Sequence, residues 1–546
     1  MSRLKTTCAT GLLLLSLHGA AIAQAHPVAA LVDGQRTAQQ ELERIRQYRQ
    51  QHRNSQRHYE PARQAQQNKF KGQSCLSYDR LELVGVSLVK PDAILPSVDE
   101  CLNADRLNQL SRELTALYLE HGYLHNVFVF EPIGQILYLR VTEGRVAKIS
   151  GQDAIVNADM LFPGLIGKPL RIHTLDQGLD HTDKFFSNKV SVDVKLQPGG
   201  DIELQMRNQS RGRAGGYVGL DNNGNKGTGR WTARAGLVID SPFSLSDSIM
   251  ISASQSLGSK PFSLYNRSLA FHYSVPYGYW DFSVFGSISQ YRDQLFIHEN
   301  RYVLDGRTWQ AGLRANYVFT RGSNHVSSVY GQLEQVSARG RFEKSVIYLQ
   351  SPVMVSAQIG WTHLRVLPDG VMWTDVAYEQ GLSWKQGYAD IYKRSYRNFS
   401  LAFNAQFYHR RGQHTWHHEH ELLARYSPHL LPAIKQLDLL DKYAVRGFRR
   451  MSTSAEKAVV LRNNLYLGQQ QGSLTIRPYV GLDIGMQKSN RSRNEKPRWA
   501  HSWSIGLKLN AHNGLDARVE FSKGRLHDHN GSWGDHALSL NLSQRF

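Results

Sequence analysis

The carboxyl-terminal part of the chain alternates between apolar and polar residues. After Ser502, every second side chain is apolar: Trp503, Ile505, Leu507 and Leu509. A turn at 512–514 follows, and the later strands repeat the pattern up to Phe546, the last residue. Strands of about ten residues with one apolar and one polar face, joined by short turns, are typical of a membrane-spanning β-barrel. The alternation therefore predicts strands that face lipid on one side and a polar lumen on the other.

The same alternation starts near residue 213. We expect sixteen strands, at 213–222, 229–239, 247–257, 263–275, 279–292, 306–319, 325–340, 354–367, 370–382, 397–410, 413–426, 456–469, 474–487, 500–511, 514–524 and 535–546. An even number is what a closed single-chain bacterial barrel requires. No run of about 18 apolar residues exists outside the N-terminus, which excludes membrane-spanning helices. The predicted fold class is mainly β, with a 16-stranded antiparallel barrel over 210–546.

The first 23 residues have the pattern of a secretory signal peptide. Arg3 and Lys5 precede a leucine-rich run, and small residues allow cleavage after Ala23 or Ala25. The chain is also strongly basic, with a formal net charge of +19. Nucleic-acid binding is one interpretation of such a charge. In an exported barrel, however, Arg and Lys line a polar lumen and face anionic lipid headgroups, so we expect no nucleic-acid partner.

Removal of the signal peptide leaves two cysteines, Cys75 and Cys101. In an oxidising compartment a lone pair of cysteines most simply forms a disulfide, and two buried free thiols are the alternative. Closing a loop of this length stabilises a small domain by roughly 3 kcal/mol.

Two similar units of about 70 residues precede the barrel, each combining a helix with several strands. They predict two small α+β domains, at 73–144 and 145–209. In the second we expect a helix at 174–187, followed by a hairpin with strands at 190–196 and 202–206.

The segment before these units has few apolar residues. Residues 37–50 are helical in composition but polar nearly all round, as in a helix that sits in a polar cavity. Residues 51–72 have almost no apolar anchor and are expected to form a flexible linker.

The longest connection in the predicted barrel spans 427–454. Doubled back, it reaches about 45 Å, whereas the apolar band of such a barrel is only about 25 Å tall. The loop is therefore long enough to fold into the pore. It contains Arg446, and a later strand carries Asp483 on the face that points to the lumen. We expect the two to pair; a solvated loop arginine is the alternative.

The residues around this pair resemble the Omp85 superfamily and, within it, the TpsB transporters of two-partner secretion. The sixth-loop motif V-R-G-[YF] is matched by Val445, Arg446, Gly447 and Phe448. The strand motif x-G-x-D-x-G is matched by Gly481, Asp483 and Gly485. The resemblance extends over almost the whole mature chain. One departure is Phe448, where many members carry Tyr, so that a phenol hydrogen bond is lost while ring packing is kept.

The resemblance implies a barrel in the Gram-negative outer membrane with two POTRA domains in the periplasm. These domains would capture one large TpsA-type exoprotein, such as a haemolysin, a filamentous haemagglutinin or a contact-dependent inhibition toxin, for export. A plug helix within 24–50 would occupy the pore at rest. Arg446 and Asp483 would anchor the sixth loop in the lumen, and Phe546 would be the signal read by the outer-membrane assembly machinery. Further expected partners are outer-membrane lipid and lipopolysaccharide, around a monomeric protein.

The same superfamily contains outer-membrane insertases, which are the alternative function, and a passive porin or adhesin is a third class. Insertases usually carry more POTRA domains and no plug helix. For capture of the exoprotein, we expect strand addition to an exposed sheet edge, in a groove lined by residues of 174–187 and of the second hairpin strand.

No nucleophile, base and orienting group converge in the sequence, so we expect neither an enzyme nor a cofactor. Four histidines lie close together, His414, His417, His418 and His420. No Cys or carboxylate cluster completes a site with them, and we expect no metal.

Overall fold

The computed structural model describes residues 74–97, 100–258, 260–261, 263–297, 300–383, 391–412, 414–492 and 494–546. The expected signal peptide, plug helix and linker lie outside these residues. No helix in the described part of the chain is long and apolar enough to cross a membrane.

The first unit is a three-stranded sheet covered by one long helix. Its sheet order is β1-β3-β2, with β1 parallel and β2 antiparallel to the central strand β3. The helix α3 buries Leu107, Leu110, Leu114 and Tyr118, which recur every three or four residues and so form one apolar stripe. The bounds are β1 Arg80–Val84, α3 Ala104–Glu120, β2 Asn126–Ile133 and β3 Ile136–Glu143.

The second unit repeats this design with one additional short helix. Its sheet order is β4-β6-β5, so that β6 is central and β5 forms an edge. Because β6 pairs on both sides, the second hairpin strand offers no exposed edge of its own, and the edges of this sheet are β4 and β5. The bounds are β4 Val146–Ser150, α4 Ala158–Leu161, α5 Ile172–Thr182, β5 Asn188–Leu196 and β6 Ile202–Ser210.

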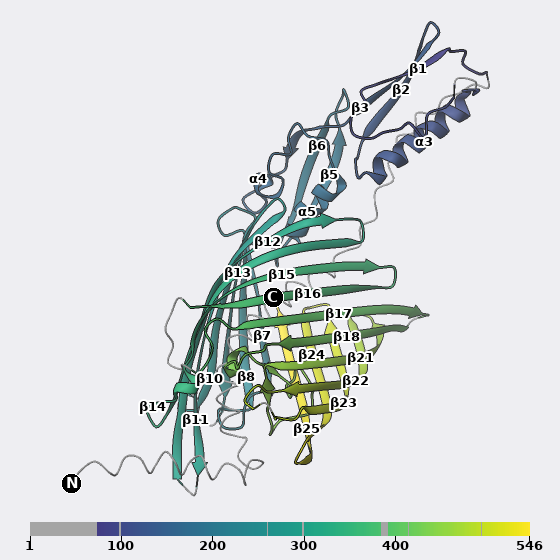
Figure 1. Cartoon of the computed structure of the whole chain (residues 1–546). Helices are drawn as coiled ribbons and strands as arrows, with labels where there is room; N and C mark the ends of the chain where they lie inside the picture. Colours follow the sequence, from purple (N-terminus) through teal and green to yellow (C-terminus); the bar gives the residue numbers. More distant parts are fainter. Residues whose placement is uncertain are drawn as a thin grey trace.

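From Ala214 onward, the strands of the described residues form a closed antiparallel barrel (Figure 1), which confirms the predicted fold class. The last strand, β25, pairs with the first, β7, and closes the sheet. Sixteen long strands carry the wall: β7 Ala214–Asp221, β8 Trp231–Asp240, β9 Ser248–Leu257, β10 Tyr265–Tyr277, β11 Trp280–Ile297, β12 Asn300–Arg321, β13 His325–Phe342, β15 Val353–Leu367, β16 Gly370–Leu382, β17 Arg397–Arg411, β18 His414–Tyr426, β21 Lys457–Gln471, β22 Leu474–Lys488, β23 Arg498–Ala511, β24 Leu515–Asp528 and β25 Gly531–Arg545. The two-residue β14, Ser345–Val346, pairs antiparallel with the end of β13.

Strands β11 and β12 are longer than the alternation predicted, which was 279–292 and 306–319. Their ladder continues without interruption to the pair Ile297 and Asn300. The added residues include Asp293, Gln294 and Arg301, so the apolar alternation does not extend over this part of the hairpin. The backbones of β11 and β12 therefore remain paired beyond the part of the hairpin that has an apolar, lipid-facing side.

The second unit rests on the short turns at one end of the barrel (Figure 1). The carboxylate of Asp240 accepts hydrogen bonds from the backbone N–H groups of Phe186 and Ser187, at 2.9 and 2.8 Å. In α5, Asp180 accepts one from Arg321 at 2.7 Å. These contacts place the second unit at the end with the short turns, which is therefore the end expected to face the periplasm.

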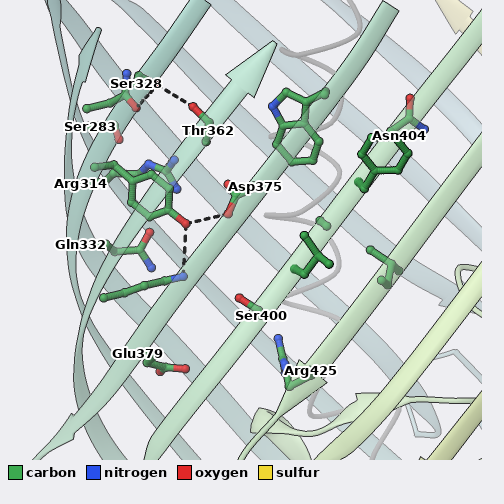
Figure 2. A pocket seen from close by; sticks show the side chains of 18 of the residues that line it. Ser283, Arg314, Ser328, Gln332, Thr362, Asp375, Glu379, Ser400, Asn404 and Arg425 are labelled. Atoms are coloured by element: carbon green, nitrogen blue, oxygen red, sulfur yellow. Dashed lines mark hydrogen bonds between the residues drawn. The ribbon is translucent and has the colours of Figure 1, made fainter. Parts of the chain in front are cut away.

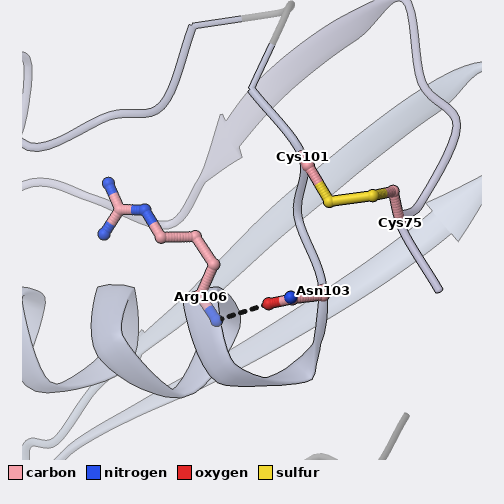
Figure 3. The surroundings of a disulfide bond; sticks show 4 residues. All are labelled: Cys75, Cys101, Asn103 and Arg106. Atoms are coloured by element: carbon pink, nitrogen blue, oxygen red, sulfur yellow. Dashed lines mark hydrogen bonds between the residues drawn. A yellow bond between two sulfur atoms is a disulfide. The ribbon is translucent and has the colours of Figure 1, made fainter. Parts of the chain in front are cut away.

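A disulfide joins Cys75, which precedes β1, to Cys101, which precedes α3 (Figure 3). Next to it, the Leu76 N–H donates to the Leu102 carbonyl at 3.1 Å. The side chain of Asn103 caps α3 by accepting from the Arg106 N–H at 3.0 Å. The bond thus ties the start of the unit to the start of its helix.

Replacing both cysteines by serine should destabilise the first unit by roughly 3 kcal/mol, because the unfolded chain then loses a closed loop. Limited proteolysis of the purified protein should show faster cleavage within 74–144, with barrel fragments unchanged. Equal cleavage of the variant and of reduced and oxidised wild-type protein would contradict this expectation.

Glu143, at the end of β3, connects three parts of the first unit. Its carboxylate accepts from the backbone N–H groups of Ser87 and Leu88, at 2.7 and 2.8 Å, and from the Tyr118 hydroxyl at 2.9 Å. Burial acts to raise the pKa of Glu143, but the hydrogen bonds from Ser87, Leu88 and Tyr118 outweigh it, and the pKa is lowered.

A lowered pKa means that the folded state favours the carboxylate. The stability it contributes is present above the unfolded pKa, about 4.3, and is lost as the pH falls through the folded value. Glu143→Gln should therefore destabilise the first unit by about 1–3 kcal/mol at pH 7 and by less at pH 3. Thermal unfolding at both pH values measures this, with the exposed Glu120→Gln as the control. A pH-independent difference between Glu143→Gln and wild type would refute the explanation.

Candidate functional site

The long loop between β18 and β21 lies inside the barrel. Leu439 and Val445 of the loop are fully buried, packed with Val460, Ala500 and Leu526 from the wall. Within the loop, Leu437–Asp438 pairs with Ser454–Ala455 as a short ribbon. An apolar contact and a local ribbon thus give this loop a defined position in the lumen.

Arg446 is among the largest fully buried side chains of the described protein, with 2% of its surface exposed. Its guanidinium meets Asp483 of β22 in a bidentate geometry, with Nε to Oδ2 at 2.7 Å and Nη2 to Oδ1 at 2.6 Å. The backbone N–H of Arg446 also donates to Asp483, at 3.0 Å. The third arm, Nη1, donates to Glu520 of β24 at 2.7 Å. One loop cation therefore lies between two carboxylates of the wall.

A second layer of polar groups holds these carboxylates in place. The Ser502 hydroxyl donates to Asp483 at 2.9 Å. Glu520 accepts from the Tyr479 hydroxyl at 2.7 Å and from Arg518 at 2.6 Å. Removing charges from water is costly, and it is tolerable only when the remaining lone pairs and protons are also paired. The cluster meets that requirement.

Glycines make room for the loop against the wall. A Cβ at position 481 would overlap the Arg446 guanidinium and Ser504 Oγ, and one at 485 would lie 2.6 Å from Leu439. Gly447 has a φ of +87°, a conformation that L side chains rarely adopt, and it lies against the backbone of β24. The loop motif at 445–448 and the strand motif at 481–485 thus pack directly against each other.

Phe448 lies against Gly524 of β24, where a Cβ would overlap its ring. The ring also packs at the margin of the apolar cluster around Val445. Phe448 therefore serves as a packing group.

A second buried contact holds the other arm of the loop. Lys435 donates to Glu334 of β13 at 2.9 Å and to Glu379 of β16 at 2.5 Å. Glu379 also accepts from the Tyr396 hydroxyl at 2.6 Å. Sequence reasoning missed Lys435, Glu334 and Glu379. The inward parity of Glu334 and Glu379 was a signal, but nothing in the sequence selects their partner.

A cavity of about 600 Å³ lies between the loop and α5 of the second unit. Figure 2 shows part of its wall, with Arg314, Asp375 and Arg425 pointing inward. Arg314 lies over the Tyr330 ring at 3.4 Å, and the Tyr330 hydroxyl donates to Asp375 at 3.0 Å. Charged groups of both signs therefore line this cavity beside apolar side chains such as Trp373 and Phe403.

The end of the chain lies at the seam of the barrel. Phe546 and Gly216 of β7 exchange two backbone hydrogen bonds, both of 3.0 Å. The Phe546 side chain itself is 72% exposed. Its backbone closes the barrel, and its ring is available to other molecules.

Comparisons with known proteins agree with this architecture. The family described as "Haemolysin secretion/activation protein ShlB/FhaC/HecB" matches residues 200–509, and "POTRA domain, ShlB-type" matches residues 76–144. The chain is 36% identical over 422 residues to "Hemolysin transporter protein ShlB" of Serratia marcescens, covering 75% of each protein. It is 31% identical over 469 residues to "Hemolysin transporter protein HpmB" of Proteus mirabilis, covering 83% of this chain and 82% of the relative.

Among solved structures, CdiB from Escherichia coli superposes with a TM-score of 0.79 at 21% identity, covering 94% of this chain and 98% of the other. That likeness shows the fold. The chain therefore belongs to the ShlB/FhaC/HecB family of haemolysin secretion/activation proteins and is an outer-membrane transporter of two-partner secretion, with its POTRA domains in the periplasm.

Proposed function

We propose that this transporter captures one large exoprotein in the periplasm and exports it, as an extended chain, through the barrel lumen to the cell surface. The observation that carries the proposal is the sixth loop, which is held in the lumen by Arg446 between Asp483 and Glu520. A loop held by buried charges is a discrete obstacle that the chain in transit must pass or displace.

Capture is best assigned to the edge strands that lie beside the helices. These are β2 in the first unit and β5 in the second. An extended exoprotein segment can add to either edge through backbone hydrogen bonds, without the need for a preformed fold. Side chains on α3 and α5 would then contact the side chains of the bound segment and so provide specificity.

In this proposal, the contacts of Arg446 and Lys435 fix the loop to different parts of the barrel wall. Arg446 fixes the loop to β22 and β24, and Lys435 fixes it to β13 and β16. Breaking a buried pair by removal of one partner costs about 3–5 kcal/mol. Release of one arm while the other holds would widen the lumen and keep the loop inside. The folding of the exoprotein outside the cell would supply the driving force.

Three further parts of the proposal concern biogenesis and assembly. We assign Phe546, through its exposed ring, as the signal read by the outer-membrane assembly machinery. The transporter acts as a monomer, and its wall contacts outer-membrane lipid. An insertase function is not favoured, because the relatives at 36% and 31% identity are transporters.

Co-expression with a candidate TpsA-type exoprotein tests the function directly. Export of that exoprotein to the medium, dependent on the transporter, is the expected result. Retention of the exoprotein in the periplasm, with the transporter fully folded in the outer membrane, would overturn the proposal.

Arg446→Ala should reduce this export at least about tenfold while the barrel still assembles, because Asp483 and Glu520 lose their shared cation. Export is read by immunoblot of the medium, and assembly by the heat-modifiable mobility of the folded barrel. Arg491→Ala is the matched control, since Arg491 is an exposed arginine in the loop that follows β22. Equal export by both variants would exclude an anchoring role for Arg446.

A photo-crosslinking residue placed at Ser191, which is exposed on the β5 edge, should form an adduct with the exoprotein during export. The control position is Lys148, exposed on the opposite edge of the same sheet. Adducts at Lys148 alone would assign capture to the β4 edge and refute the assignment to β5.

A further inference from the structure

A row of arginines crosses the outer surface of the barrel wall on β10–β13. The register places Arg267 opposite Gln290, Gln290 opposite Arg307, and Arg307 opposite Arg339. All three arginines are exposed. A second row, farther from the periplasmic end, aligns Arg292, Asp305 and Arg341. The two rows together, called here the arginine patch, hold five arginines and one carboxylate.

The patch faces outward. Along β12, Leu304, Thr308 and Gln310 are buried toward the interior. Arg307 has the opposite parity, shared with the exposed Leu313 and Phe319 of the lipid-facing surface. The wall beneath the patch is apolar, because Leu269, Ile288 and Trp309 are aligned two residues closer to the periplasm along their strands.

The height of the patch matches the outer boundary of the lipid band. Gly278 lies in the periplasmic turn, where its N–H donates to Met160 of α4 at 2.9 Å. From Gly278 to Ile288 the strand rises about 33 Å along its axis, or about 25 Å along the membrane normal at the usual tilt of about 40°. The arginine rows begin immediately above Ile288. They therefore lie at the level of the outer-leaflet headgroups.

Among the residues that the structure describes, most of this charge has no acidic partner. Arg341 is paired with Asp305, and Arg267 donates to Gln290 at 3.0 and 2.7 Å. In the described part of the chain, the side chains of Arg292, Arg307 and Arg339 have neither an ion pair nor a hydrogen bond. Arg307 and Arg339 also stand directly opposite each other, an arrangement that repels when nothing lies between the charges. An anion between them would remove that repulsion.

We propose that the arginine patch binds the phosphate groups of a phosphorylated outer-leaflet glycolipid, lipopolysaccharide. Guanidinium groups bind phosphate oxygens in bidentate pairs. Two arginines on adjacent strands, with Cβ atoms about 5 Å apart, can share one phosphate. The acyl chains then lie along Leu269, Ile288 and Trp309. The bound lipid would contact only the β10–β13 side of the barrel. It would fix the position of that side along the membrane normal.

The test uses the full-length transporter, purified in detergent and mixed with lipid A, with native mass spectrometry as the readout. Wild-type protein should retain one more bisphosphorylated lipid A than Arg307→Gln/Arg339→Gln, a drop of at least about tenfold in occupancy of that site. The control variant, Arg365→Gln/Arg411→Gln, removes two exposed arginines at the periplasmic rim and should bind as wild type does. Heat-modifiable mobility verifies that each variant is folded.

A second comparison needs no variant. Wild-type protein should lose the same bound lipid when bisphosphorylated lipid A is replaced by its dephosphorylated form. Equal retention of both forms would show recognition through acyl chains and overturn the proposal. Equal binding by the wild type and the Arg307→Gln/Arg339→Gln protein, or equal loss in the rim control, would also overturn it.

Discussion

The buried contact between Arg446 and the two wall carboxylates is the constraint on which the lumen depends. Ion pairs of this kind are weak evidence for stability, since desolvation offsets much of their attraction. Such a contact instead fixes the register of the loop: a loop that slipped by one residue would withdraw Arg446 from both Asp483 and Glu520 and leave Glu520 with Arg518 alone. The glycines at 481, 485 and 524 follow from this contact, because side chains there would overlap the loop.

The lumen owes its shape to two such contacts on different parts of the wall. Arg446 holds one arm of the loop to β22 and β24, and Lys435 holds the other to β13 and β16. The loop therefore crosses the lumen. The cavity lies between it and α5, which is itself held to the barrel rim through Arg321 and Asp180. Movement of either the loop or α5 would therefore change the volume of this cavity.

How far the sequence could predict this fold depends on periodicity. Residues such as Leu482 and Ile484 face lipid and alternate with buried neighbours, so a period of two locates the strands to within a few residues. The outer ends of β11 and β12 carry no such signal, because they rise beyond the apolar band. The central place of β6 was equally hidden, since the order of strands within a sheet depends on pairings between distant segments.

The sequence by itself determined three features: the barrel, which residues of its strands face lipid and which face the lumen, and the inward position of Asp483. These features follow from local period and composition. The motif around Arg446 pointed to the loop. Only the tertiary structure decided that Glu520 shares this arginine, that Lys435 pairs with Glu334 and Glu379, and that Arg307 faces Arg339. Each of these contacts joins residues from separate strands or loops. Which charges meet is set by strand register and by the path of the loop, and neither is encoded in any single segment.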